Sequence, residues 1–327
     1  MTDQSPIIAL AIGDPNGIGP ELAVKAAVAA RNSGARAALV GDAFVIERYL
    51  REIAPDYALR PLTAGAPARE NAIDFHPVEA LPRADFEPGR IAAGAGRATV
   101  AYVQAALDLV RTGAARAIVA CPHNETAVNA AGITFSGYPE LIAQLSGLPE
   151  GRVFLMLVGG GLRIVHATLH ERIHNALARL TPQLVEAAAL AAADALRTLG
   201  VAGARIGLFG VNPHAGEGGL FGDDDDRITT PAAKMLRARG LDVEGPVGAD
   251  VLLGRKDIDA FVAMYHDQGH IPVKLVAGRT ASALSIGAGV LFSTVGHGSA
   301  FDIAGRNMAD PEPVLRTLAL VAGARTS

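Results

Sequence analysis

The sequence predicts an α/β protein of two lobes, in which a largely parallel sheet is covered by helices on both faces. Short runs rich in Val, Ile and Leu alternate along the chain with longer Ala- and Leu-rich segments at helical spacing. Such alternation is typical of parallel strands joined by helical crossovers. The chain has 327 residues, more than the roughly 250–300 that one hydrophobic core usually supports. We therefore expect two lobes.

The expected elements follow from apolar runs and their spacing. Pro20 favours the start of a helix, because its fixed φ suits the first helical turn. Strands are expected at 6–12, 36–40, Ala117–Ala120, 153–158, 163–169, 206–211, 260–265 and 290–295. Helices are expected at 20–31, Ala43–Ile53, 95–112, 182–199, 230–239 and 311–322. Ligands of such folds bind beyond the carboxyl ends of the strands, so functional residues should lie there.

Composition excludes several classes of function. The net charge is −4 without a basic stripe, which argues against a nucleic-acid partner. No signal peptide is evident, and the apolar run at 153–158 is far shorter than the ~20 residues of a membrane helix. The single cysteine, Cys121, excludes an intrachain disulfide and fits a reducing compartment. We expect a cytoplasmic protein that does not bind membranes.

A glycine-rich segment, 13–21, follows the first expected strand and opens the first expected helix. Its glycines would let backbone amides approach a ligand, and a helix N-terminus favours negative charge. The segment lacks the GxGxxG spacing of a dinucleotide fingerprint, so a ligand loop and a structural turn both remain open. The acidic run Asp223–Asp226 is interpreted as a solvated helix start.

Three histidines distant in sequence stand near expected strand ends: His170, His214 and His266. Three converging imidazoles with one open position would form a catalytic site for a zinc-like ion. No HExxH or paired CxxC motif is present. Structural or solvated histidines are the alternative interpretation.

Two other groupings use spacings of four residues. His166, His170 and His174 could share a helical face, but 162–169 is β-branched and alternating, which favours a strand. A strand would place His166 and His170 on one face and His174 in the following turn. His266 and His270 are also four residues apart, but Gly269 and Pro272 argue against a helix there.

Two charged residues near His266 are candidates for the same site. Asp267 could orient a metal-binding imidazole or hold the water on the metal. Lys274 could pair with an anion or extend along the surface with its charge in water.

The segment 296–306 follows the last expected strand. Its glycines and small residues permit a tight loop against a flat ring such as adenine. Asp302 could accept hydrogen bonds from a ribose or from the loop backbone. From the pattern alone, an ordinary glycine-rich loop is equally compatible.

These motifs carry a resemblance. The run 297–306 resembles the nucleotide-binding loop of the isocitrate and isopropylmalate dehydrogenases. The whole chain resembles the related 4-hydroxythreonine-4-phosphate dehydrogenase family, which 13–21, 212–219, 265–269 and Lys274 match in order and spacing. The resemblance implies an isocitrate/isopropylmalate dehydrogenase-like α/β/α fold, with one lobe at 1–130 plus 281–327 and the other at 131–280. It also implies a homodimer whose active site lies in the interdomain cleft near the dimer interface.

The resemblance also implies the cofactors and their ligands. A divalent metal, expected to be zinc with Mg, Mn or Co as alternatives, would be held by His170, His214 and His266, at least one of them from the other subunit. Lys274 would contact substrate, and Asp267 is the second expected catalytic residue. NAD would be held by Gly296, His297, Gly298, Ser299, Ala300, Asp302 and Gly305.

Departures from the family bear on the substrate. The family's phosphate-binding His-Thr pair aligns with the segment 137–140, which contains Tyr138, and Glu125 replaces a lysine. Ala283 and Phe292 replace an asparagine and an arginine. Because a phosphate dianion needs charged donors, a phosphorylated substrate is disfavoured.

The terephthalate cis-dihydrodiol dehydrogenases are the branch of this family that resembles the chain in these departures. The resemblance implies oxidation and decarboxylation of a small carboxylate, from the dihydrodiol to protocatechuate, with Tyr138 and Phe292 as substrate contacts. Two alternatives stay open: a 4-hydroxythreonine-4-phosphate dehydrogenase, and a metal-dependent hydrolase that does not use NAD.

Overall fold

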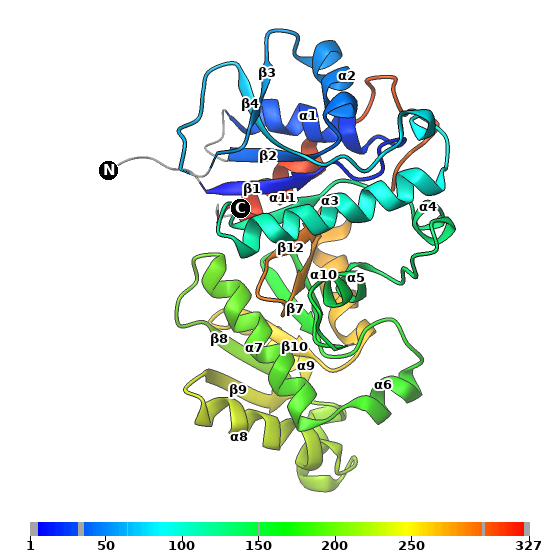
Figure 1. Ribbon diagram of the computed structural model, residues 1–327. Helices are drawn as coiled ribbons and strands as arrows, with labels where there is room; N and C mark the ends of the chain where they lie inside the picture. Colours follow the sequence, from blue (N-terminus) through cyan, green and yellow to red (C-terminus); the bar gives the residue numbers. More distant parts are fainter. Residues whose placement is uncertain (1–5, 32–35, 64, 150, 296–297, 324–327) are drawn as a thin grey trace. The chain divides into compact units, whose positions relative to one another are not determined.

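The chain divides into two compact units, which are described separately (Figure 1). The computed structural model describes residues 6–31, 36–63, 65–149, 151–295 and 298–323. Unit 1 comprises Met1–Ser136 with Val290–Ser327, and unit 2 comprises Gly137–Gly289. The sequence and the resemblance predict boundaries after residues 130 and 280.

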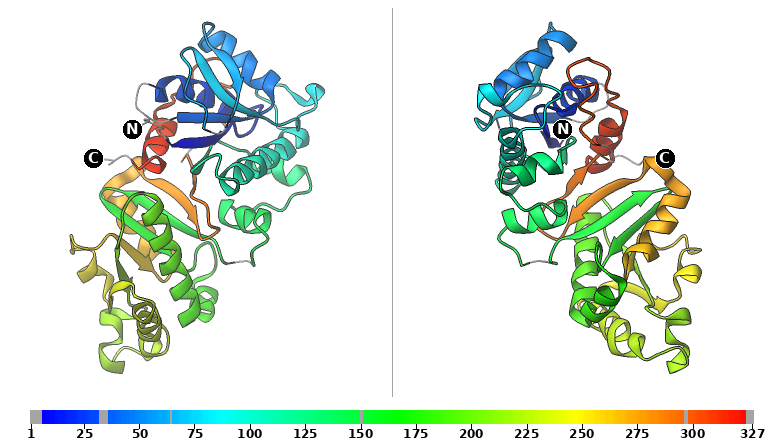
Figure 2. Two further views of the ribbon diagram at one scale, coloured as in Figure 1. Left: turned by 60° about the vertical axis from the view of Figure 1, so that its left-hand side comes forward. Right: turned by 90° about the vertical axis from the view of Figure 1, so that its right-hand side faces the viewer.

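Unit 1 is built on a parallel sheet in the order β3-β4-β2-β1-β5-β12. Its strands are β1 (Ile7–Ala11), β2 (Arg36–Gly41), β3 (Ala58–Pro61), β4 (Ala72–Pro77), β5 (Ala117–Ala120) and β12 (Phe292–Thr294). Its helices are α1 (Gly19–Ala30), α2 (Ala43–Ile53), α3 (Ala93–Arg111), α4 (Glu125–Ala130) and α11 (Glu312–Val321), with a 3-10 turn η1 at Arg83–Asp85. The central strands β1 and β5 are almost wholly apolar and buried, which explains why they are evident in the sequence. Helix α11, red, packs beside α1, blue (Figure 2).

Unit 2 contains a mixed sheet in the order β11-β6-β7-β10-β8-β9. Strand β6 runs antiparallel to both β7 and β11, and the other neighbours are parallel. The strands are β6 (Phe154–Gly159), β7 (Leu162–His166), β8 (Arg205–Phe209), β9 (Asp242–Val247), β10 (Ala260–Ala263) and β11 (Ser282–Ile286). The helices are α5 (Tyr138–Leu145), α6 (Ile173–Arg179), α7 (Pro182–Thr198), α8 (Thr230–Ala238), α9 (Ala249–Leu252) and α10 (His266–Ala277). The remaining helical segments are the 3-10 segments η2 (Pro213–Gly219) and η4 (Gly278–Thr280) and the π-helical segment η3 (Asp225–Thr229).

The core of unit 2 joins α10 to the sheet. Val273 of α10 is buried against Leu157 of β6 and Ile164 of β7 in one apolar cluster. Phe209 and Phe261 stack in the same cluster with ring centroids 5.5 Å apart. This packing fixes α10 against β6 and β7, and the candidate site begins where β7 ends.

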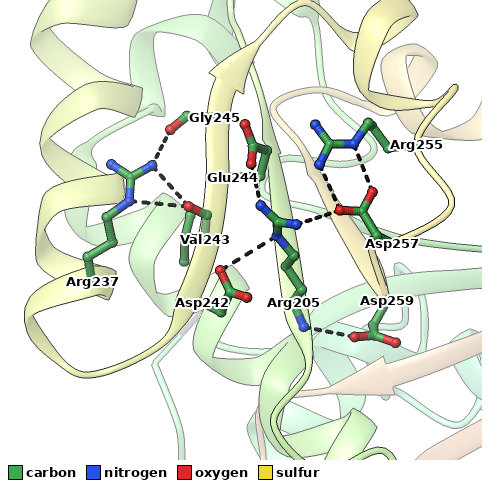
Figure 3. Close-up of polar contacts among 9 residues, drawn as sticks. All are labelled: Arg205, Arg237, Asp242, Val243, Glu244, Gly245, Arg255, Asp257 and Asp259. Atoms are coloured by element: carbon green, nitrogen blue, oxygen red, sulfur yellow. Dashed lines mark hydrogen bonds and ion pairs between the residues drawn. The ribbon is translucent and has the colours of Figure 1, made fainter.

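An ion-pair network fixes the amino end of β8 (Figure 3). The Arg205 guanidinium lies 2.6 Å from Glu244 of β9 and also pairs with Asp257. The Arg205 backbone N–H donates to Asp259 at 2.8 Å. The network therefore holds β8, β9 and the segment before β10 together at the end of the sheet opposite their carboxyl termini.

The α/β class predicted from the sequence is confirmed, but one helix contradicts the prediction. Gly269 and Pro272 argue against a helix after His266, whereas α10 runs through both. The Gln268 side chain accepts from Met264 N and donates to Gly210 O, both at 2.7 Å, so it anchors the first turn of α10 to the sheet. These tertiary bonds and the burial of Val273 offset the hydrogen bond that Pro272 cannot donate.

In the part of the chain that the structure describes, no helix combines the length and apolar character needed to cross a membrane.

Candidate functional site

Four histidines gather where β7 ends and α10 begins. The strand expected at 163–169 is present as β7, but it ends at His166 and His170 lies beyond it in a bend. The expectation that His166 and His170 share a strand face is therefore wrong. His174 lies in helix α6 rather than in a turn. The segment after β7 is tied to β10, since Ala167 N donates to Ala263 O at 2.8 Å and Thr168 Oγ1 donates to Met264 O at 2.7 Å.

Ring distances show how closely these imidazoles approach. The His170 and His266 ring centroids are 5.4 Å apart. His266 and His270, one turn apart on α10, stack at 3.7 Å with an interplanar angle of 12°. His166 lies 4.5 Å from the His270 ring. The structure therefore brings two of the three expected metal ligands together, along with two histidines that the sequence analysis did not assign.

Hydrogen bonds set the orientation of the α10 imidazoles. His266 Nδ1 donates to Asp267 Oδ1 at 2.6 Å, as expected for a carboxylate that orients an imidazole. His270 Nδ1 lies 2.9 Å from His166 Nε2. Because the Nδ1 atom of His266 is engaged, its Nε2 atom remains available to a ligand.

Burial favours the neutral form of His166, His170 and His270. It lowers the pKa of His166 to about 3 and that of His270 to about 4, and neighbouring histidines act in the same direction. Burial also lowers the pKa of His170, assisted by His266. A neutral imidazole has a lone pair, which is the form that binds a metal ion or accepts a proton.

His214 occupies a strained loop that is tied to an acidic turn. It has φ +52°, a conformation rare for residues with a side chain. Buried Asp225 accepts hydrogen bonds from Val211 N at 2.8 Å and Asn212 N at 3.0 Å. Asp224 accepts one from Asn212 Nδ2 at 3.0 Å.

The interpretation of Asp223–Asp226 as a solvated run is therefore wrong for Asp225. Its carboxylate accepts hydrogen bonds from the backbone amides of the segment that leads to His214. The charged run gave no sign of this, since only the fold shows which of its carboxylates turns inward.

The three expected ligands, His170, His214 and His266, are of a type that binds divalent metals. Within one chain the described contacts do not bring all three together. Imidazole nitrogens suit zinc and similar ions. Among the described residues no group of three or more His, Cys, Asp or Glu side chains is placed to hold a metal ion. His170 and His266 lie close together, and no described contact joins His214 to either of them.

Lys274 extends the row of functional groups along α10. It lies four residues after His270 and eight after His266, and its side chain is exposed. Its charge contributes to the lowered pKa of His270, which places it near that ring. The helix thus presents two imidazoles and one ammonium group along one side.

Unit 1 holds the expected cofactor loop. Gly296 and His297 lie outside the described residues. Gly298 and Asp302 are exposed, whereas Ser299 is buried and its Oγ has no hydrogen-bond partner among the described residues. Ala300 and Gly305 have φ of +38° and +74°, so the loop turns sharply at both positions.

The segment 13–21 packs directly on that loop. Ile18 N donates to Ser299 O at 2.9 Å, and a Cβ atom at Gly17 would lie 2.7 Å from Ser299 Cβ. Asp14 is fully buried, with Oδ1 accepting from Asn16 N at 2.9 Å. Burial raises the pKa of Asp14 to about 6. Gly17 is thus needed for the close approach of the two loops, whatever ligand they hold.

The two expected substrate contacts are buried. Phe292 is 0% exposed within β12, and Tyr138 is 7% exposed at the start of α5. Neither side chain offers much surface to a ligand in this structure. Of the two, Tyr138 lies at the start of a helix and Phe292 at the start of strand β12.

Comparisons with known proteins agree over nearly the whole chain. The family model for the pyridoxal phosphate biosynthetic protein PdxA matches residues 33–321. The chain is 48% identical to the 1,2-dihydroxy-3,5-cyclohexadiene-1,4-dicarboxylate dehydrogenase of Comamonas sp, over 96% of each chain. It is 39% identical to the D-threonate 4-phosphate dehydrogenase of Cupriavidus necator, over 97% of each. The solved terephthalate 1,2-cis-dihydrodiol dehydrogenase of Burkholderia xenovorans LB400 is 57% identical, with a TM-score of 0.84 over 97% of this chain and 98% of that one.

Proposed function

Because the chain belongs to the family of the pyridoxal phosphate biosynthetic protein PdxA, we propose that it is an NAD-dependent, divalent-metal-dependent dehydrogenase. Its substrate in this proposal is terephthalate cis-dihydrodiol, a cyclohexadiene diol with two carboxylates. The similarity to two dihydrodiol dehydrogenases, at 48% and 57% identity, is the observation that carries this choice.

The residues at the family's phosphate-binding positions support a substrate without phosphate. Glu125 is exposed at the start of α4, where the family has a lysine. Ala283 and buried Phe292 provide no hydrogen-bonding side chain where the family has an asparagine and an arginine. A carboxylate next to a hydrophobic ring makes smaller demands on charged donors than a phosphate dianion does.

The cofactors would supply a Lewis acid and a hydride acceptor, which side chains lack. A divalent cation on His170, His214 and His266 would withdraw charge from the substrate hydroxyl, and NAD+ on the 296–305 loop would accept hydride. The chain's own part is positional: Asp267 holds His266 through Nδ1, and Asp225 holds the backbone that leads to His214.

The reaction balances as an oxidation followed by loss of CO2. Bound NAD+ would accept a hydride from the carbinol carbon that carries a hydrogen, and the hydroxyl proton of that carbon would be released. The resulting ketone lies β to a carboxylate, so the C–C bond to that carboxylate breaks and CO2 departs. The electron pair of that bond leaves an enolate, whose oxygen takes up a proton equivalent to the one released in the oxidation. The ring becomes aromatic as protocatechuate, which makes the step effectively irreversible. Lys274 either neutralises the second carboxylate or assists proton transfer.

We further propose that the active enzyme is a homodimer in which His170, His214 and His266 do not all come from one subunit. This accounts for the separation of His214 from the other two within a chain. Helix α10 supports it with apolar side chains exposed to solvent: Ile271 at 60%, Leu275 at 82% and Val276 at 55%. Such a patch beside the histidines suits a contact between subunits.

A substrate panel tests the proposal. The purified protein receives NAD+ and Zn2+ with the dihydrodiol, 4-hydroxythreonine 4-phosphate or D-threonate 4-phosphate, and NADH absorbance is followed. Turnover of the dihydrodiol alone is expected, and turnover of a phosphorylated substrate instead would overturn the substrate choice. His214→Ala should abolish turnover with the fold intact, whereas the exposed histidine variant His174→Ala serves as the control.

The same assay addresses the metal-dependent hydrolase. Formation of NADH that depends on both NAD+ and substrate is incompatible with simple hydrolysis. Metal-dependent conversion that proceeds without NAD+ would favour the hydrolase.

A further inference from the structure

Two histidines, His166 and His270, are not among the proposed metal ligands. Together with Leu155 O they form a row of hydrogen-bonded groups beside His266, called here the histidine chain. His166 is 1% exposed and ends β7, and His270 lies on α10 one turn after His266. His166 Nδ1 lies 3.1 Å from Leu155 O, and His166 Nε2 lies 2.9 Å from His270 Nδ1. The hydrogen bonds run from the backbone of β6 through both rings.

These contacts determine where each proton sits. A peptide carbonyl only accepts, so His166 must donate to Leu155 O from Nδ1. The neutral His166 ring then has a bare Nε2, which can only accept, and His270 must donate to it from Nδ1. His270 therefore also has its proton on Nδ1, and its Nε2 is unprotonated.

The fold makes room for this chain at one position. A Cβ atom at Gly269 would collide with His166 Nε2 and would lie 2.9 Å from Ile164 Cγ2. Any side chain there would push α10 away from β7 and separate His166 from His270. The glycine that seemed to argue against a helix is thus a condition for the contact between this helix and the His166 ring.

His270, at the end of the histidine chain, packs on His266. The His270 ring lies 3.7 Å from the His266 ring and is nearly parallel to it, so a fixed His270 restricts rotation of His266 about its χ2. The Asp267 contact fixes Nδ1 of His266 but is made by an exposed side chain on the first turn. Stacking on the histidine chain, which ends in buried His166, therefore holds the His266 ring more rigidly than the exposed Asp267 carboxylate can.

We propose that the chain Leu155 O–His166–His270 is a positioning device that fixes the ring plane of His266 and so presents its Nε2 to the bound cation. The proposal rests on the proposed function in that it takes His266 as a metal ligand. His166 and His270 act through His266 and touch neither substrate nor cofactor.

Metal-free protein with 15N-labelled histidine provides the first test, because long-range 1H–15N spectra distinguish the two tautomers of each ring. Both His166 and His270 should have a protonated Nδ1 and an unprotonated Nε2. In His166→Leu, the His270 ring keeps its hydrogen bond to the His266 backbone but loses His166 as an acceptor, so the 1H and 15N shifts of its Nδ1–H should move. A proton on Nε2 of either ring in the unmodified protein would overturn the proposal.

Zinc affinity, measured by competition with a chromophoric chelator, provides the second test. His166→Leu should weaken Zn2+ binding by about 10–100-fold, the usual effect of losing an outer support of a metal ligand. His166→Gln keeps an acceptor for His270 and should regain most of the affinity, and His174→Leu should have no effect. Unchanged affinity in His166→Leu would contradict the proposal.

His270→Ala, at a half-buried position, is the second variant if His166→Leu does not fold, and it should weaken Zn2+ binding similarly. His266→Ala separates the two proposals. If it leaves Zn2+ affinity unchanged, the proposed metal site fails, whereas the tautomers in metal-free protein still decide whether the histidine chain exists.

Discussion

Replacing Asp225 with Ala tests whether a buried carboxylate holds the loop that leads to His214. Asp225 is 2% exposed and accepts from Val211 N, Asn212 N and Thr229 Oγ1 at 2.8, 3.0 and 2.6 Å. In Asp225→Ala the Thr229 hydroxyl can still donate to the carbonyl oxygen of residue 225, 3.3 Å away. The two backbone amides have no such substitute.

The magnitude follows from those two amides. An unpartnered buried donor costs about 1–3 kcal/mol, and water can reach part-buried ones, so we expect about 2–4 kcal/mol of destabilisation. Amide hydrogen exchange is the most local assay, and Val211 and Asn212 should exchange faster in Asp225→Ala. Asp226→Ala changes an exposed neighbour and is the matched control. Equal exchange rates and equal thermal unfolding in the two variants would refute the argument.

Three further outcomes are expected. Folding raises the pKa of Asp14 from 3.8 to about 6, so its contribution to stability is present below pH 4 and lost as pH rises through 6. Thermal unfolding should therefore show Asp14→Asn to be more stable than the unmodified protein at pH 7.5, by at most about 3 kcal/mol. That gain in stability should vanish near pH 4. Gly17→Ala forces a Cβ against Ser299 and should weaken NADH binding about tenfold in a fluorescence titration, with Zn2+ affinity unchanged; equal NADH affinity would separate this loop from the cofactor. Lys274→Met should raise KM for the dicarboxylate by about 10–100-fold if the lysine neutralises a carboxylate. A fall in kcat alone would instead assign Lys274 to proton transfer. Lys256→Met, at an exposed position, is the control.

How much of the fold the sequence predicts depends on burial. The buried strands β1 and β5 are continuous apolar runs and were predicted within two residues of their bounds. Strands β3, β4 and β9, in contrast, lie at or next to sheet edges with several part-exposed residues, so their composition resembles that of loops. Local pattern is strong where both faces of a strand are covered and weak at the edges.

The candidate site divides in the same way. His170 and His266 could be selected because each stands near a strand end. Their partners could not, since the contact between His166 and His270 joins residues 104 apart and depends on how α10 packs over β7. Propensity misjudged α10 itself, because Gly269 and Pro272 are unfavourable in an isolated helix but are compatible with one that the sheet anchors.

The central claim is that this chain couples hydride transfer to loss of CO2 from a dihydrodiol dicarboxylate, with a divalent metal. Its most direct test is a stoichiometric one: metal-depleted protein is supplied with NAD+ and the dihydrodiol, Zn2+ is then added, and NADH, CO2 and protocatechuate are measured together. We predict no product before Zn2+ and equal molar amounts of all three afterwards. Formation of NADH without CO2, or equal turnover in the metal-depleted protein, would contradict the account.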